Sequence, residues 1–383
     1  MIKRTMLTIG AVLAATGVAA CGSTGTTTTQ TSATAQGGTA TNTAATTRSG
    51  SATAELAPSL KPPTALAVNK PLSRRPPVEK AVFLSNGIEI AQQIGQGMQA
   101  ASQALGWRYS TLTVDQNNPA TVASNMLSAI NSGANVVFVS ATPVAVFARV
   151  LPIARQHHTV IIDVASGNPP TNGITALVNN ASQNGPVWGK MLALGALSDA
   201  EQRNVTAKIL LVTSPVFATI LGPTDAAAKS TVAQTCPSCS FATLDIPAGD
   251  LFSGKAPADV VSYLQSHQSV NYILQDSSLT DQGLSAALKP LGLTSLRIFG
   301  VAPLQPQVNE VTSGQEAGWV VDPLQVEGWM AVDAAARSFT HDDPTLYNAQ
   351  GIPSYLLTKA NSPGPTEVPT DYQSQFRTIW HAQ

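Results

Sequence analysis

The chain has 383 residues, of which 43% are hydrophobic and 11% charged, and its formal net charge is −1. This balance, without any block of basic residues, argues against nucleic acid as a partner. About 300 residues remain after the N-terminal segments described next, a length that predicts two domains.

The first 20 residues predict a secretory leader. Lys3 and Arg4 precede an apolar stretch that glycines interrupt, and Cys21 follows small residues. The stretch is too short and too broken for a comfortable membrane span. Small residues before a cysteine resemble a bacterial lipobox, which implies cleavage before Cys21, lipid on its thiol, and anchoring to the outer face of the cell membrane. The alternative is an ordinary secreted protein with a chance cysteine.

Residues 21–77 predict a tether. The segment is rich in Thr, Ser, Ala and Gly and then in Pro, with few large apolar residues. Such a composition buries too little surface to fold. As a flexible coil it would span roughly 40 Å. We therefore expect the folded part to begin near residue 78.

From residue 81 onward, short apolar runs alternate with segments of helical periodicity. This alternation predicts parallel strands joined by crossover helices, and the apolar strands predict a sheet covered on both faces. We expect strands at 81–84, 109–114, 135–139 and 159–163, and helices at 90–105, 121–130 and 144–156.

After residue 180 the same alternation restarts, so the predicted fold class is α/β with two doubly wound parallel-sheet lobes. In the last long helix we expect Glu327, Asp333 and Arg337 to face water. One further apolar run, at 355–357, follows among prolines. Expected strands are 209–212, 241–246, 271–274, 296–299 and 318–322, and expected helices are 186–197, 223–234, 257–265, 279–288 and 324–339.

Six short markers occur in a fixed order across residues 80–340. By that order and spacing the chain resembles the type I periplasmic binding proteins, the ribose-binding class of sugar-type solute-binding subunits of ABC importers. The markers are Ser85-Asn86, Ile162-Asp163, Val178-Asn179-Asn180 with Gly185, Leu274-Gln275-Asp276 with Gly283, Phe299-Gly300-Val301, and Val320-Val321-Asp322-Pro323 with Gly328.

The resemblance implies two lobes that close on a ligand and three chain crossings between them, near 176–180, 301–305 and 322. It assigns 78–178 plus 323–350 to the N-terminal lobe, and 179–322 plus 351–383 to the C-terminal lobe. It also implies a small polar ligand, a sugar or polyol, and a permease partner. We expect a monomer with no cofactor, no metal and no catalytic residues.

The same resemblance gives candidate ligand residues. Asn86 and Asp163 match polar residues at the ends of the family's first and fourth strands, where ligands of open sheets bind. Asp276 matches a position in the second lobe, with Gln275 or Ser277 as alternatives one residue away. Asp322 stands where the family commonly has glutamine. For Asn86 and Asp163 the alternative role is turn formation or helix capping.

Departures from the ribose binders concern their aromatic and basic residues. Ile88 and Glu89 replace two aromatics, Val164 replaces an arginine, and Ala302 replaces an aspartate. Phe217 remains available to stack on a sugar ring. The predicted cleft thus has more carboxylate than a ribose site, which leaves an amine or cationic ligand open as an alternative. The carboxylates concerned are Glu89, Asp163, Asp276 and Asp322.

Cys236 and Cys239 have the spacing of a redox dithiol, but they follow a predicted helix instead of starting one. A redox pair places its first thiol at a helix N-terminus. In an oxidising compartment a structural disulfide is the favoured interpretation.

Motif searches give no catalytic site. The sequence has no Gly-x-Ser-x-Gly elbow, no P-loop and no second Cys or His pair to complete a zinc site. An extracytoplasmic hydrolase would need a nucleophile and a base that no motif supplies. A sensory lipoprotein that reports ligand occupancy to a membrane receptor remains an alternative to a transport role.

Overall fold

The computed structural model describes residues 51–115, 118 and 120–382. The predicted leader, Cys21 and the tether up to residue 50 lie outside the described residues. The chain separates into two units, 1–48 and 49–383, and every element below belongs to the second. None of the helices in the described part is both long and apolar enough to cross a membrane.

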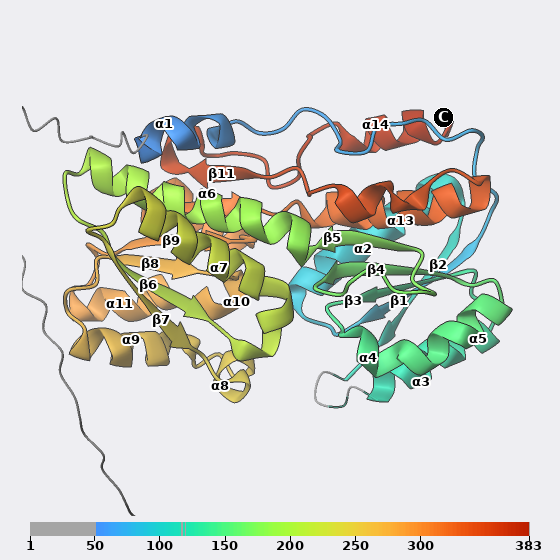
Figure 1. Ribbon diagram of the computed structural model, residues 1–383, viewed down its shortest axis with the longest axis horizontal. Helices are drawn as coiled ribbons and strands as arrows, with labels where there is room; N and C mark the ends of the chain where they lie inside the picture. The colour runs from blue at the N-terminus through green and yellow to red at the C-terminus, as the bar shows by residue number, and fades with distance from the viewer. Residues whose placement is uncertain (1–50, 116–117, 119, 383) are drawn as a thin grey trace, which may run out of the picture. The chain divides into compact units, whose positions relative to one another are not determined.

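Sheet A has five parallel strands in the order β2-β1-β3-β4-β5 (Figure 1). β5 was not predicted as a strand, and the predicted helix at 144–156 is broken near Pro152. The strands are β1 Lys80–Ser85, β2 Arg108–Thr113, β3 Val136–Ser140, β4 Val160–Ser166 and β5 Ala176–Asn180; the helices are α2 Glu89–Leu105, α3 Ala120–Asn131, α4 Val144–Phe147, η2 Ala148–Val150 and α5 Leu151–Gln156.

Sheet B has six strands in the order β11-β10-β9-β8-β6-β7, parallel except for β11. Gly283, at φ +83°, divides the predicted helix at 279–288 into two. The strands are β6 Lys208–Thr213, β7 Ser240–Asp245, β8 Tyr272–Gln275, β9 Arg297–Val301, β10 Gly318–Val321 and β11 Tyr355–Thr358; the helices are α6 Ala181–Gln202, η3 Pro215–Phe217, α7 Ala218–Thr235, α8 Ala248–Phe252, α9 Ala256–Ser266, α10 Ser278–Asp281, α11 Leu284–Leu288, η4 Lys289–Leu291 and α12 Gln305–Ser313.

The chain passes from sheet A to sheet B between β5 and α6, and returns between β10 and α13 (Leu324–Thr340), which packs on α2. It enters sheet B again as β11, after η5 (Pro344–Ala349), which contacts β5. The predicted crossing at 301–305 is wrong, because β9 and β10 are neighbours in one sheet.

Two glycines allow α13 and α2 to approach closely. A Cβ atom on Gly97 would overlap the backbone of Gln325, and one on Gly328 would overlap the backbone of Ile94. Because only glycine lacks Cβ, these positions let the two helix backbones meet. This contact holds the returning segment of the chain against sheet A.

The prediction that 21–77 does not fold is wrong for residues 51–77, which we call the strap. Its helix α1 (Ala52–Leu56) packs on α6, and η1 (Ala57–Leu60) follows. Glu201 of α6 accepts hydrogen bonds from the backbone N–H groups of Ala52 and Thr53. Beyond η1 the strap runs toward α14 (Tyr372–Ile379), as Figure 1 shows. A few well-spaced apolar side chains are buried and suffice to hold it: Ala52, Leu56, Leu66, Val68 and Leu72.

The expectation that Glu327, Asp333 and Arg337 face water is also wrong, since all three are fully buried. Asp333 accepts hydrogen bonds from Arg337 Nε at 2.7 Å, from the Tyr347 hydroxyl at 2.6 Å and from Trp380 Nε1 at 2.6 Å. One of these partners lies on α13 itself, and the other two come from η5 and the end of α14. Asp333 is therefore satisfied by protein groups and not by solvent.

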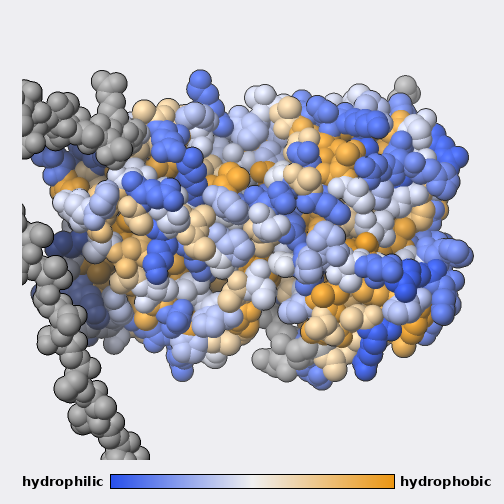
Figure 2. All heavy atoms as spheres, viewed as in Figure 1, coloured by the Kyte–Doolittle hydropathy of each residue, from blue (hydrophilic) through white to orange (hydrophobic). Residues whose placement is uncertain are grey.

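The C-terminal tail divides between the two sheets, although 351–383 was expected to lie wholly in the C-terminal lobe. β11 pairs with β10, η6 (Lys359–Asn361) follows it, and α14 packs on α13. There Trp380 stacks on Trp329 with ring centroids 5.2 Å apart. Outside these contacts, hydrophilic and hydrophobic residues are interspersed over the face drawn in Figure 2.

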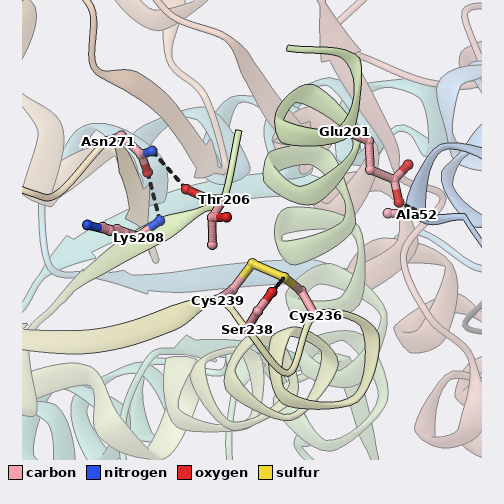
Figure 3. The surroundings of a disulfide bond; sticks show 8 residues. All are labelled: Ala52, Glu201, Thr206, Lys208, Cys236, Ser238, Cys239 and Asn271. Atoms are coloured by element: carbon pink, nitrogen blue, oxygen red, sulfur yellow. Dashed lines mark hydrogen bonds between the residues drawn. A yellow bond between two sulfur atoms is a disulfide. The ribbon is translucent and has the colours of Figure 1, made fainter. Parts of the chain in front are cut away.

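A disulfide joins Cys236 and Cys239, as the structural interpretation predicts. It closes the turn between α7 and β7, near the end of α6 that carries Glu201 (Figure 3). In the same view the side chain of Asn271 accepts a hydrogen bond from the Lys208 N–H at 2.7 Å and donates one to the Thr206 carbonyl at 3.0 Å. In the chain-entropy description so short a loop contributes about 2 kcal/mol.

Removing the strap should destabilise the protein. We expect a chain of residues 78–383 to melt at least about 5 °C below one of residues 51–383, because a buried leucine or valine contributes about 1.5–3 kcal/mol. Thermal unfolding followed by circular dichroism measures the difference, with Arg75→Ala in the longer chain as the control at an exposed strap position. Equal melting temperatures for the two lengths would show that the strap adds no stability.

Candidate functional site

A cavity lies where the carboxyl ends of strands from both sheets meet. Its volume is about 90 Å³. On the same measure one water molecule needs about 10–15 Å³, so several small groups fit in the cavity. Its walls are mainly apolar. The lining residues are Ile88, Ile90, Ala141, Ala165, Asn179, Ala181, Gly185, Trp188, Phe217, Ile220, Leu221, Asp276, Ser277, Leu279, Val301, Ala302 and Asp322.

Four lining residues at strand ends have left-handed backbone conformations. In sheet A, Ala141 directly follows β3 and Ala165 is the penultimate residue of β4, both at φ +50°. Asn179, near the end of β5, is at φ +54°, and Ala302, directly after β9, is at φ +57°. Such conformations cost of order 1–3 kcal/mol for residues other than glycine and concentrate at ligand sites. Three of the four are alanines, so the strained turns also leave room inside the cavity.

Asp276 directly follows β8 and is 1% exposed. The Thr213 hydroxyl contacts Asp276 Oδ2 at 2.6 Å and Asp225 Oδ2 at 3.0 Å. One hydroxyl carries one proton, so both contacts are satisfied only when one of the carboxyl groups is protonated. Burial and the nearby Asp225 raise the pKa of Asp276 well above its usual range. Its Oδ1 has no hydrogen-bond partner among the described residues.

Asp322 lies at the second crossing, within a buried polar network. Asn179 Nδ2 donates to Glu327 Oε2 at 2.8 Å and contacts Asp322 Oδ2 at 3.5 Å. Burial, with the charge of Glu367, raises the pKa of Asp322 to about 7. Burial likewise raises the pKa of Glu367 to about 7, although it accepts two backbone N–H groups at the start of α13. Asp322 Oδ1, like Asp276 Oδ1, is buried without a partner in the described part of the chain.

Two aromatic side chains form part of the apolar wall. Phe217, which we predicted, packs edge to face against Phe252 with centroids 6.2 Å apart. Trp188 was missed, because in the sequence it is one of many apolar residues on a predicted helix. Its Nε1 donates to Ser354 Oγ at 2.9 Å, which fixes the ring in place. Ring faces of this kind suit the C–H side of a small ligand.

The cavity brings together three of the seven predicted ligand residues: Phe217, Asp276 and Asp322. Asn86 lines a separate, open hollow with Asp115 and Phe252. Glu89 is exposed at the start of α2.

Asp163 and Gln275 are buried beneath the cavity surface. Asp163 Oδ2 accepts hydrogen bonds from Ser166 Oγ at 2.6 Å and Asn168 Nδ2 at 2.8 Å. Gln275 Oε1 accepts from the Thr280 hydroxyl at 2.7 Å. In the structure both side chains support the turns that follow their strands, and a direct ligand role for them remains only a prediction from the sequence.

The family described as "Periplasmic binding protein domain" matches residues 82–341. A search of curated proteins gave no match.

Solved structures of solute-binding proteins have the same fold at low sequence identity. An ABC sugar transporter subunit from Rhodobacter sphaeroides has TM-score 0.62 at 17% identity, covering 74% of this chain and 99% of that one. A solute-binding protein from Burkholderia graminis in complex with D-arabinose has TM-score 0.65 at 15% identity, covering 77% and 100%. One from Bacillus halodurans with myo-inositol has TM-score 0.61 at 13% identity, covering 76% and 97%.

The raised pKa values at the crossing predict an unusual dependence of stability on pH. Asp322, Glu327 and Glu367 have folded pKa values above the ordinary value near 4. The folded state therefore binds more protons than the unfolded state between about pH 4 and 7, and stability falls as pH rises through that window. We expect a smaller free energy of unfolding at pH 8 than at pH 5 by denaturant titration.

Asp322→Asn should reduce that difference, because it removes one of the titrating groups. Asp371→Asn, at an exposed position, is the matched control and should leave the difference unchanged. A free energy of unfolding that increases from pH 5 to pH 8 would contradict the assignment.

Proposed function

The chain belongs to the periplasmic binding protein domain family, and we propose that it captures a small sugar or polyol between its two lobes and delivers it to an ABC importer. The family consists of extracytoplasmic solute-binding proteins, which catalyse no reaction. Two of the three solved structures named above are bound to D-arabinose and myo-inositol, both polyhydroxylated molecules.

One observation carries the choice of ligand. Asp276 and Asp322 line the same cavity, and Oδ1 of each is buried without a hydrogen-bond partner among the described residues. An unsatisfied buried polar group costs about 1–3 kcal/mol, which a ligand group can recover. These two oxygens are therefore the expected contacts of the ligand's polar groups.

The protonation of these carboxyl groups favours a neutral ligand. Burial raises the pKa of Asp276 well above its usual range and that of Asp322 to about 7, so both carboxyl groups favour the neutral form more than an exposed carboxylate does. A protonated carboxyl group both donates and accepts hydrogen bonds, which matches a hydroxyl group. Fully charged carboxylates would instead favour the amine or cation left open by the sequence. Trp188 and Phe217 complete the site as apolar surfaces for the ligand's C–H groups.

Contacts from both sheets suggest capture by closure of the lobes. Asp276 belongs to sheet B, whereas Ala141 and Ala165 stand at the ends of sheet A strands. A ligand that contacts both lobes stabilises the closed state, and only this differential affinity shifts the equilibrium. The backbone at Gly167 already lies against Thr219 of α7, so closely that a Cβ atom there would overlap the Thr219 carbonyl.

The proposal extends to the N-terminus. With a leader and a lipid on Cys21, the protein would remain at the outer face of the membrane as a monomer, near a permease. The segment before residue 51 would then serve as the tether, shorter than the sequence predicts because the strap belongs to the folded part.

A ligand screen tests the proposal. Residues 51–383 should gain several degrees in melting temperature with one or more sugars or polyols at 10 mM, because ligand at a thousandfold excess over Kd adds about 4 kcal/mol. Amino acids and simple amines should give no shift. A strong amine hit with no sugar or polyol hit would contradict a neutral ligand.

Calorimetry with the best ligand then tests the site. Asp276→Ala should weaken binding at least about tenfold, since one lost hydrogen bond of about 1.4 kcal/mol corresponds to that factor. Glu89→Ala removes an exposed carboxylate outside the cavity and should bind as the unmodified chain does. Equal affinity in a folded Asp276→Ala would exclude Asp276 as a ligand contact.

A further inference from the structure

Three carboxyl groups lie together in the C-terminal lobe, and none of them belongs to a residue that lines the cavity. They belong to Asp281 at the end of α10, Glu310 in α12 and Glu316 just before β10. One oxygen from each lies within 4.8 Å of the others. Asp281 and Glu316 are each 1% exposed, and Glu310 is half-buried. The cluster thus joins three segments and has access to solvent on one side only.

Asp281 carries an unsatisfied oxygen in this cluster. Its Oδ2 accepts a hydrogen bond from Gln307 Nε2 at 3.0 Å. Its Oδ1 is buried and has no hydrogen-bond partner in the described residues. The carboxyl group is therefore fixed on one side by Gln307, and its remaining oxygen lacks the ligand that a buried oxygen requires.

Glu316 accepts hydrogen bonds from two neutral donors, and its carboxyl group also contacts those of Asp281 and Glu310. Ser285 Oγ donates to Oε1 at 3.2 Å, and Trp319 Nε1 donates to Oε2. None of the ion pairs formed by the described residues includes Asp281, Glu310 or Glu316. Three adjacent carboxylates cannot all be charged in such a place without a positive partner, either protons or a metal cation.

The coordination preferences of the two common divalent cations favour Ca²⁺ at such a cluster. Ca²⁺ accepts carboxylate oxygens at about 2.3–2.6 Å in a flexible geometry, whereas Mg²⁺ demands near-ideal octahedral geometry and keeps several waters. The three oxygens lie within 4.8 Å of one another, so they can reach one Ca²⁺ ion, and solvent has access on one side only.

We propose that Asp281, Glu310 and Glu316 form a binding site for one divalent cation, with Ca²⁺ preferred and water completing the coordination on the Glu310 side. α10 starts two residues after Asp276, so a cation here would tie the segment that carries this cavity residue to α12 and β10. The site is independent of which solute the cavity binds.

Calcium titration tests the proposal. After treatment with EDTA and its removal, 10 mM CaCl₂ should raise the melting temperature of residues 51–383 by about 2 °C or more, as expected for a Kd near 1 mM. MgCl₂ should have a smaller effect. Tb³⁺, a Ca²⁺ substitute, should luminesce on tryptophan excitation because Trp319 contacts Glu316, and Ca²⁺ should quench the signal by displacement.

Variants assign the effect to this cluster. Asp281→Asn and Glu310→Gln should lose the calcium shift and the Tb³⁺ signal, and the half-buried position of Glu310 makes its variant the safer one for folding. Asp250→Asn, which alters a half-buried carboxylate in α8 outside the cluster, should keep both. The proposal would be overturned if calcium did not shift the melting temperature of the unmodified chain, or if the shift persisted in Glu310→Gln. Protons shared among the three carboxyl groups would then account for the cluster.

Discussion

The amide of Asn179 connects the parts of the structure on which binding depends. It donates to Glu327 and contacts Asp322 on the returning chain, and its Oδ1 accepts from Asn184 of α6. Asn184 Oδ1 in turn accepts from the backbone of Ile352, just before β11. All three passages between the sheets therefore meet in one buried network. Because Asn179 and Asp322 also line the cavity, a change in ligand occupancy acts directly on the junction between the lobes.

Burial decides the chemistry of the cavity. The sequence suggested four carboxylates and hence an anionic cleft, but only Asp276 and Asp322 reach the cavity, and both have raised pKa values. In water each would be charged at neutral pH. Inside the cavity, desolvation favours the neutral form, and the site presents hydroxyl-like groups against an apolar wall. Such a surface is better suited to a sugar or polyol than to an ion.

Sequence periodicity was sufficient to predict the two sheets, because parallel strands covered on both faces must be nearly all apolar. It failed where long-range contacts decide the outcome. The strap holds only scattered apolar residues, which stay buried because α1 packs on α6 and Leu72 lies beside α14. Asp333 appeared solvent-facing because its partners Tyr347 and Trp380 are distant in sequence. The sequence did not identify Trp188 as a cavity residue, because an apolar side chain on a predicted helix looks the same whether it lines a cavity or packs in the core.

The central claim is that solute binding closes the two lobes around the cavity. Small-angle X-ray scattering of residues 51–383, with and without saturating ligand, measures this most directly. We expect the radius of gyration to decrease on binding in the unmodified chain. In Gly167→Val it should not decrease, because the added side chain would overlap the backbone of Thr219. Binding to the unmodified chain at saturation with no change in its radius of gyration would contradict capture by closure.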